Sequence, residues 1–313
     1  MKAAVYTRSR PPDVVQIKDV EKPVPKDDEV LIKVRAASVN PLDYHLRKVA
    51  PYIVRIPGRD VAGTVEAAGR NVKQFKPGDE VFGTCLGAFA EYACASESRL
   101  VTKPHSVTSE QAASAPVAAY TALQGLRDKG HLQPGQKVLI NGAAGGVGTF
   151  AVQIAKWFGA GVTGVCSTRN VDMVRSIGAD RVIDYSQEDF TKSGQRYDLI
   201  FDLVANHSLL ACTRALNPKG TYVGAGILGL GHSVASILGG LLKTLVLSPL
   251  VSQKVVTFTA RSSQEDLTLL GELMATGKIT PVIDRCYRLS EVPEAVRYLA
   301  EGHARGKVVI TLD

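Results

Sequence analysis

Aromatic residues and cysteines are scarce in this sequence of 313 residues. Aromatic side chains make up 6% of the chain, and the five cysteines stand apart, with no Cys-x-x-Cys pair. This odd, scattered set argues against the disulfide framework of small secreted domains and indicates reduced thiols. The N-terminus also lacks an apolar signal region, so we expect a cytoplasmic protein.

Long basic runs are missing too, although the formal net charge is +7. Without a cluster of Lys and Arg, nucleic-acid binding is not expected, and the charge suits anionic small ligands. One apolar stretch, residues 227–251, is long enough to span a bilayer. His232, Lys243, Pro249 and four glycines interrupt it, which favours a buried segment or subunit contact over a membrane association.

The pattern of apolar residues along the sequence changes near residue 117. Before it, short apolar runs are separated by turn signals such as Pro57-Gly58, which is typical of strands. After it, strands alternate with amphipathic helices, which predicts a doubly wound parallel sheet. The expected strands are 29–39, 60–69, 79–85, 137–142, 161–167, 181–185, 197–204, 220–226, 254–260 and 306–312. The expected helices follow residue 145 and cover 171–178, 208–216, 265–277 and 291–302.

The segment NGAAGGVG, residues 141–148, joins a predicted strand to a predicted helix. In such a turn Gly145 allows backbone to approach a pyrophosphate, Gly148 allows close packing of helix and strand, and Ala143 replaces the usual first glycine. The helix N-terminus offers N–H groups and a positive dipole end to phosphates. This context favours dinucleotide binding over a purely structural turn. The residues expected to contact the cofactor here are Gly142, Ala144, Gly145, Gly146, Val147 and Gly148.

The end of the next predicted strand, residues 165–170, distinguishes the two nicotinamide cofactors. NAD-binding folds place an acidic residue there to hold the ribose 2′-OH, and this stretch contains none. Ser167 offers a hydroxyl, and Arg169 offers a planar cation suited to phosphate. The sequence therefore predicts NADPH rather than NADH. The alternative is that Arg169 is only a solvated residue at the start of a helix.

With these motifs the chain resembles the zinc-independent quinone oxidoreductases of the medium-chain dehydrogenase/reductase superfamily, the group that includes zeta-crystallin. The markers extend over nearly the whole chain: SVNPLDYHLR (38–47), PGRDVAGTV (57–65), GAFAEYA (87–93), AAYTAL (118–123), NGAAGGVG (141–148), GKITPVID and GHARGKVVI. The resemblance implies an α/β protein with two domains. A Rossmann-type doubly wound parallel sheet domain, 117–259, would bind NADP, and segments 1–116 and 260–313 would form a mostly β, GroES-like catalytic domain.

The resemblance also implies roles for individual residues. Asn40 and Asp43 would lie near the nicotinamide, and Tyr44 and His45 are candidate proton donors. His45 stands where the family often has a tyrosine, so water is the alternative donor. Further cofactor contacts would come from Asn40, Thr121, Tyr185, Leu203, Val204, Gly224, Gly226, Arg305 and Lys307. A structural role is the alternative for Arg305 and Lys307.

No metal is expected. Zinc dehydrogenases of this superfamily carry a cysteine near the position of Asn40 and a Gly-His-Glu motif, where this chain has Arg59 and Asp60. Its cysteines and histidines also lack the clustering that tetrahedral zinc needs. Without a metal to polarise oxygen, the expected activity is NADPH-dependent hydride transfer to quinones or α,β-unsaturated carbonyls. The alternatives are a non-catalytic NADPH-binding protein with a structural or RNA-binding role, and a membrane-associated protein docked by residues 227–251.

The predicted strand 254–260 would be the last strand of the nucleotide domain's sheet. An edge strand exposes unpaired N–H and C=O groups, and no proline or inner charge protects this one. Members of the superfamily pair it with its copy across a two-fold axis, which satisfies both edges. The resemblance therefore implies a homodimer.

Overall fold

The computed structural model describes residues 1–6, 15–43, 55–225 and 252–312. The chain forms two compact units. The first combines Met1–Ala118 with Ser262–Asp313, and the second contains Ala119–Arg261. The boundary after Ala118 falls inside helix α3, Pro116–Gln124.

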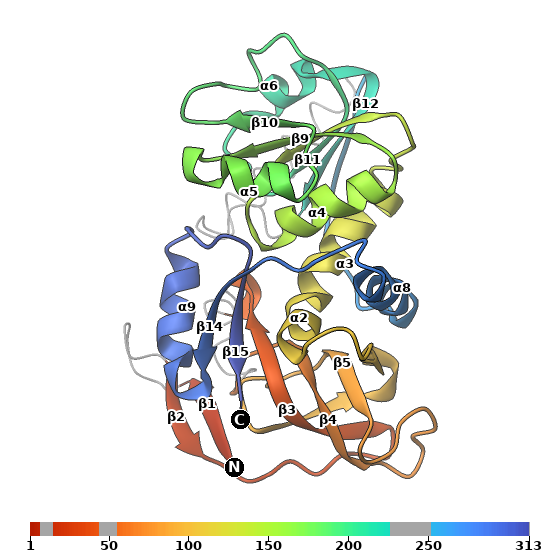
Figure 1. Ribbon diagram of the computed structural model, residues 1–313, viewed down its shortest axis with the longest axis vertical. Coiled ribbons are helices and arrows are strands. Elements are labelled where there is room, and N and C mark those ends of the chain that lie inside the picture. Colours follow the sequence, from red (N-terminus) through yellow and green to blue (C-terminus); the bar gives the residue numbers. More distant parts are fainter. Residues whose placement is uncertain (7–14, 44–54, 226–251, 313) are drawn as a thin grey trace. The chain divides into compact units, whose positions relative to one another are not determined.

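The first unit is mostly β (Figure 1). Its main sheet has seven strands in the order β14-β15-β3-β4-β5-β7, with β6 paired to β3, and β1 and β2 form a separate antiparallel pair. The strands are β1 (Lys2–Tyr6), β2 (Val15–Asp19), β3 (Glu29–Val39), β4 (Asp60–Ala68), β5 (Glu80–Thr84), β6 (Tyr92–Ser96), β7 (Leu100–Thr102), β14 (Ile283–Arg288) and β15 (Lys307–Thr311). The helices of this unit are α2 (Ser109–Ser114), α8 (Gln264–Ala275) and α9 (Val292–Ala300), with single 3₁₀ turns at Glu97–Arg99 and Leu289–Glu291.

Strand β3 is the centre of this sheet because it pairs with β4, β6 and β15. Its apolar side chains, such as Ile32 and Val34, lie in one core with Phe89 and Ile310. Near the end of β3, Ser38 pairs with the first residue of β4, Asp60, and Val39 pairs with Val308 at the start of β15. Three chain segments far apart in sequence therefore meet at one end of β3.

The second unit contains a six-stranded parallel sheet in the order β10-β9-β8-β11-β12-β13 (Figure 1). Its strands are β8 (Lys137–Asn141), β9 (Gly161–Cys166), β10 (Arg181–Asp184), β11 (Tyr197–Asp202), β12 (Leu216–Ala225) and β13 (Lys254–Phe258). Its helices are α4 (Gly146–Trp157), α5 (Val171–Ser176) and α6 (Leu209–Arg214), besides a π-helical turn at Gly125–Lys129 and a 3₁₀ turn at Thr168–Asn170. Helices α4 and α5 pack on strands β8, β9 and β10. The predicted Rossmann-type sheet is confirmed.

The carboxyl ends of these strands lie at one edge of the sheet. Asn141 at the end of β8 pairs with Val165 of β9 and with Asp202 of β11. Gly224, near the end of β12, pairs with Asp202 in turn. Ligands of open parallel sheets bind outside this edge, so the loops that leave it are the place to look for a cofactor site.

Most predicted elements appear within one or two residues of their expected bounds, and the differences have local causes. The helix expected over 208–216 ends at Arg214, and β12 already begins at Leu216. The new strand passes through Lys219, which has a φ of 65°, and its pairing with β11 is irregular. Strands β2, β6, β7 and β14 and helices α2 and α3 were not predicted. The apolar stretch 227–251 lies outside the described residues, among which no helix is long and apolar enough to cross a membrane.

Candidate functional site

The glycine-rich turn connects the end of β8 to the start of α4. The N–H groups of Gly142 and Ala143 donate to the carbonyl of Val165, at 3.2 and 3.0 Å, which fixes the turn to the neighbouring strand. Gly142 has a φ of 89°, a conformation that favours glycine. Ala143 is not among the described residues with positive φ, so it takes the first glycine's place without backbone strain.

The last two glycines of the turn differ in the space around them. A Cβ on Gly148 would overlap the carbonyl oxygen of Gly142 and come within 2.8 Å of the Cα of Ala143. A Cβ on Gly145 would meet only the oxygen of Gly142, at 3.5 Å. Gly148 therefore serves close packing, whereas the described residues leave room for a Cβ at Gly145.

Gly145 is also the N-cap of α4, and no side chain caps this helix. The first i to i−4 bond runs from the Thr149 N–H to the Gly145 carbonyl. The N–H groups of the first helical turn thus lack intrahelical partners and carry the positive end of the helix dipole. An open backbone surface of this kind fits the pyrophosphate of a dinucleotide.

The residues predicted to hold the 2′-phosphate follow two adjacent strands. Ser167 and Arg169 follow β9, and Tyr185 follows β10, where Cys166 pairs with Asp184. Arg169 and Tyr185 are both exposed. The topology therefore brings these three residues to the same side of the sheet's carboxyl edge.

Asp184 is an acidic residue that the sequence analysis did not weigh at this place. Its carboxylate accepts hydrogen bonds from the Thr168 and Ser186 hydroxyls at 2.6 and 2.8 Å, and from the Ser186 N–H at 3.0 Å. These bonds, first that of Thr168, hold the pKa of Asp184 below its usual range. The Asp184 carboxylate thereby joins the loop that follows β9 to the loop that follows β10. The end of β9 contains no acidic residue, as predicted, but the end of the neighbouring strand β10 carries Asp184.

The turn after β11, which carries Leu203 and Val204, is held by a buried polar network. Asp202 is fully buried, and its Oδ1 accepts from the N–H groups of Val204 and Ala205 and from Asn141 Nδ2, at 2.9–3.0 Å. Its Oδ2 accepts from the Tyr222 hydroxyl at 2.8 Å. Burial first, then the Asp202 carboxylate, raises the pKa of Tyr222, so this hydroxyl stays protonated. The sequence feature that could have predicted this network is the acidic residue at the end of the apolar strand YDLIFD.

In the first unit, Asn40 lies in a second buried polar cluster at the end of β3. Lys307 Nζ donates to Asn40 Oδ1 at 2.7 Å and lies 3.5 Å from Asp60 Oδ2. Asp60 Oδ2 also accepts from Asn40 Nδ2 at 2.8 Å and from the Ser38 hydroxyl at 2.7 Å. Asp60 Oδ1 accepts the N–H of Val117 in the first turn of α3 at 3.0 Å. The predicted residues Asn40 and Lys307 are thus in direct contact, through strands β3, β4 and β15.

Asp43 belongs to the same cluster. Its Oδ2 accepts the backbone N–H of Asn40 at 2.7 Å, and its own carbonyl accepts the Tyr6 hydroxyl. Burial raises the pKa of Asp43 to about 7, the Asp60 carboxylate adds to this rise, and the Asn40 hydrogen bond opposes it. Asp43 is therefore a carboxyl group that titrates near neutral pH beside Asn40.

The pKa of Asp43 predicts a pH-dependent stability. The folded state holds this proton more tightly than the unfolded state, so its stabilising effect is complete below about 4 and is lost as the pH rises through about 7. Asp43→Asn should raise the free energy of unfolding at pH 8 by at least about 1 kcal/mol, because one pKa unit corresponds to about 1.4 kcal/mol. At pH 4 it should change little. Urea unfolding at both pH values measures this, and an equal effect at both would contradict it.

Three further predicted site residues lie within the described part of the chain. Thr121 is buried in α3, and Gly224 is buried in β12. Arg305 is exposed, and its backbone N–H donates to Asp284 at 2.9 Å. Tyr44, His45 and Gly226 lie outside the described residues.

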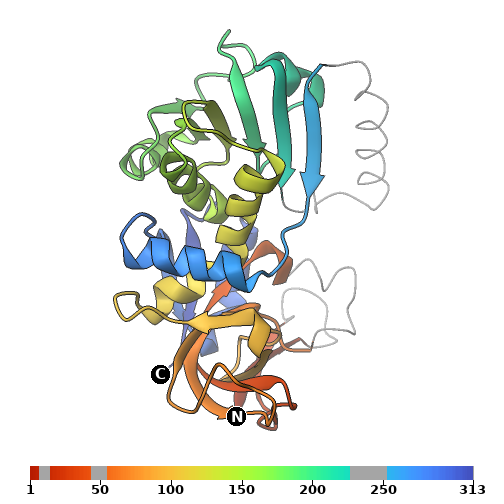
Figure 2. The same cartoon turned by 90° about the vertical axis from the view of Figure 1, so that its right-hand side faces the viewer.

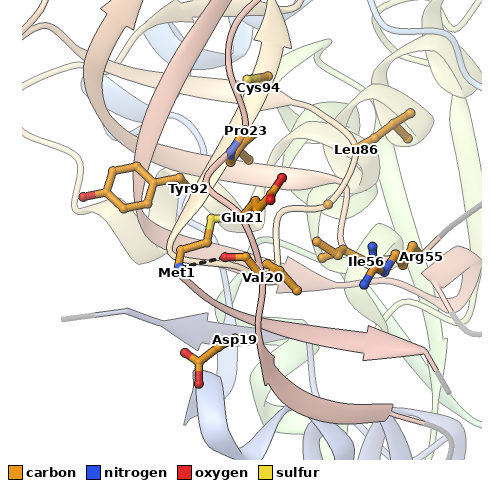
Figure 3. A pocket seen from close by; sticks show the side chains of 12 residues that line it. Met1, Asp19, Val20, Glu21, Pro23, Arg55, Ile56, Leu86, Tyr92 and Cys94 are labelled. Carbon is orange, nitrogen blue, oxygen red and sulfur yellow. Dashed lines mark hydrogen bonds between the residues drawn. The ribbon is translucent and has the colours of Figure 1, made fainter.

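Within the described ranges no three His, Cys, Asp or Glu side chains gather as a metal site would require. A hollow of about 750 Å³ in the first unit is lined by Arg55, Leu86, Tyr92 and Cys94, among others (Figure 3). The Met1 ammonium beside it is bonded to the Val20 carbonyl at 2.8 Å, and burial raises the pKa of Cys94 to about 11. None of the predicted site residues lines this hollow.

Two family models match separate parts of the chain. Residues 26–105 match the model described as alcohol dehydrogenase GroES-like domain. Residues 177–310 match the model described as zinc-binding dehydrogenase. The residues matched by the GroES-like model include strands β3 to β7, which form most of the sheet around Asn40 and Asp60.

Similar proteins extend the match to nearly the whole chain. The mitochondrial NAD(P)H oxidoreductase RTN4IP1 of Mus musculus is 38% identical, over 91% of this chain and 82% of its own. The structure of the quinone oxidoreductase from Coxiella burnetii is 30% identical, with a TM-score of 0.89 over 100% of this chain and 99% of that one. This chain belongs to the zinc-independent quinone oxidoreductase branch of the medium-chain dehydrogenase/reductase superfamily.

The family also includes relatives named for other acceptors. The chloroplastic NADPH-dependent alkenal/one oxidoreductase of Arabidopsis thaliana is 33% identical to this family member, over 99% of this chain and 79% of its own. The predicted family and α/β fold class are therefore confirmed. In this member of the quinone oxidoreductase branch, a buried lysine and a buried aspartate both bond the side chain of Asn40.

Proposed function

We propose that this protein is an NADPH-dependent oxidoreductase that transfers a hydride to quinones or to α,β-unsaturated carbonyl compounds. The observation that carries the proposal is the open glycine turn at the N-terminus of α4, where the protein leaves room beside Gly145 and uncapped N–H groups. Relatives named as quinone oxidoreductase and as alkenal/one oxidoreductase support both acceptor classes.

The residues of the turn would bind the pyrophosphate through backbone N–H groups. The Asp202 network would hold Leu203 and Val204 in place at the same edge of the sheet. The bound cofactor supplies a hydride at nicotinamide C4. Asn40 and Asp43 would lie beside the reacting groups and orient the acceptor, since positioning supplies much of the rate in such reactions.

The proposal is tested by steady-state oxidation of NADPH, followed at 340 nm, with a panel of quinones and enones. Turnover of at least one class, with NADPH preferred to NADH, is the expected result. Tight NADPH binding without turnover on any acceptor would instead support a non-catalytic NADPH-binding protein. Activity that is lost on removal of a tightly bound zinc would contradict the metal-free site.

Arg169 gives a specific prediction for the choice of cofactor. Arg169→Ala should weaken NADPH binding by about 1.5–3 kcal/mol, the range for a hydrogen bond to a charged group. NADH binding should barely change, because NADH has no 2′-phosphate. Isothermal titration with both cofactors measures the difference, and Arg175→Ala, an exposed arginine paired with Asp172 on α5, is the matched control. Equal losses for NADPH and NADH would count against the 2′-phosphate site.

We also propose that the protein is a homodimer joined through β13. In support of this, β13 has a neighbour on one side only among the described strands, as the edge of the sheet in Figure 2 illustrates. Light scattering at micromolar concentration should give about twice the chain mass of 33.4 kDa. Thr257→Pro should weaken the dimer by removing a backbone donor. A wild-type mass equal to that of one chain would rule the dimer out.

Cytoplasmic localisation is the last part of the proposal. All five cysteines are unpaired, and burial raises the pKa of Cys212 to about 12, as expected of thiols that stay reduced. Fractionation of cells that express the full chain tests it, and recovery in an organelle or membrane fraction would overturn it.

A further inference from the structure

The amide of Asn40 lies between a buried cation and a buried anion. Its Oδ1 accepts from Lys307 Nζ at 2.7 Å, and its Nδ2 donates to Asp60 Oδ2 at 2.8 Å. The side chains of Lys307 and Asp60 are 3% and 0% exposed. A flipped amide would turn its NH₂ group toward the ammonium and its oxygen toward the carboxylate. Only one orientation of this amide is therefore favourable.

The backbone of Asn40 is held separately from its side chain. The Asn40 N–H donates to Asp43, and the Asp43 N–H donates to the Asn40 carbonyl at 2.9 Å. Lys307 touches neither of these bonds. Its ammonium donates to the Asn40 amide and to the Asp60 carboxylate, and it acts on Asp43 only through its charge.

A buried ion pair is seldom the most stable way to fill a core, because an apolar side chain of similar size avoids the loss of solvation. Here the pair orients an amide. In that orientation Nδ2 makes a second, longer hydrogen bond, 3.4 Å to the Ser38 carbonyl oxygen, and no other among the residues that the structure describes. A cation beside the amide oxygen also makes the Nδ2 protons better hydrogen-bond donors.

We propose that Lys307 and Asp60 are positioning residues, which hold the Asn40 amide so that its second Nδ2 proton is available to the oxygen of a quinone or enone. This inference rests on the proposed function, in which Asn40 lies beside the reacting groups. It assigns Lys307 to the substrate side of the reaction instead of to the cofactor.

The kinetic test uses the double variant Lys307→Met with Asp60→Asn, which removes both charges together and leaves no lone buried ion. Its kcat should fall about 10- to 100-fold, the scale for a misplaced group in an active site, while KM for NADPH stays within about twofold. The single variant Lys307→Arg should have a higher kcat than the double variant, because it keeps a cation beside Asn40. In an Asn40→Ala background, the double replacement should cause no further loss, because residues that act as one unit are not additive. Full additivity, or a double variant with wild-type kcat, would overturn the inference.

A second measurement does not depend on activity. The side-chain NH₂ resonances of Asn40, assigned by their absence in Asn40→Ala, should exchange slowly with solvent in the wild type and quickly in the Lys307 and Asp60 double variant. The matched control is Lys103→Met with Glu80→Gln. It removes another lysine ammonium, 6% exposed and 3.5 Å from its carboxylate, that bonds the Val107 carbonyl and not Asn40.

The outcomes separate the two proposals. A wild-type protein without turnover on any quinone or enone would contradict the proposed function. An Asn40 amide that exchanges equally in wild type and double variant sinks the inference, whatever the activity. The control variant should keep both the kcat and the slow exchange, and loss of either there would show that any buried charge in this unit has the same effect.

Discussion

Lys307→Met is expected to lower the free energy of unfolding by about 3–5 kcal/mol, the usual cost of removing one partner from a buried ion pair. The substitution leaves the Asp60 carboxylate fully buried without its cation. It also removes the donor to Asn40 Oδ1. Urea unfolding at pH 7 measures the loss.

Adding Asp60→Asn should recover most of this stability, because the buried negative charge disappears with its partner. The single and double variants together separate the cost of an unpaired charge from the cost of the lost lysine side chain. A loss below about 1 kcal/mol for Lys307→Met alone would show that Asp60 is well solvated or protonated without Lys307.

Gly145→Ala is expected to lose NADPH affinity and keep its stability, whereas Gly148→Ala is expected to lose stability. At Gly145 the backbone φ of −81° suits alanine, and the new Cβ meets nothing closer than 3.5 Å. The variant should fold with wild-type stability, yet NADPH affinity should fall more than tenfold, that is by more than about 1.4 kcal/mol. The reason is that the methyl group occupies the space a pyrophosphate needs.

At Gly148 the methyl group would overlap the Gly142 carbonyl. Forcing a methyl group into a closely packed site costs about 1–3 kcal/mol, so the second unit should lose stability. Thermal unfolding and NADPH titration on both variants measure the contrast. If Gly145→Ala bound NADPH as well as the wild type, the cofactor would not use this turn.

The sequence predicted those parts of the fold whose evidence is local. Strand β3 has the expected bounds, because the charged turn before Glu29 and the Asn40-Pro41 step after Val39 mark both ends. Strand β14 was missed because its sequence, IDRCYR, carries three charged residues and does not alternate as a half-buried strand should. Its place depends on pairing with β15, which no local pattern reveals.

The same distinction applies to the candidate site. Gly145, Gly148 and Ser167 were predicted as cofactor contacts from their spacing along the chain. The network of Asn141, Asp202 and Tyr222 was missed, since its members come from three strands and are joined only by sheet register. The contact between Asn40 and Lys307 was also out of reach, because its partners are 267 residues apart.

That separation affects how the chain acquires its structure during synthesis. Residues 119–261 form one continuous unit that can fold as soon as it leaves the ribosome. Strand β3 is made before this unit, yet part of one of its edges pairs with β15, whose residues follow the second unit in the sequence. Until β15 has been made, Asp60 lacks the Lys307 ammonium, and we expect the first unit to stay open. Completion of the Asn40 cluster would thus require segments from both sides of the second unit.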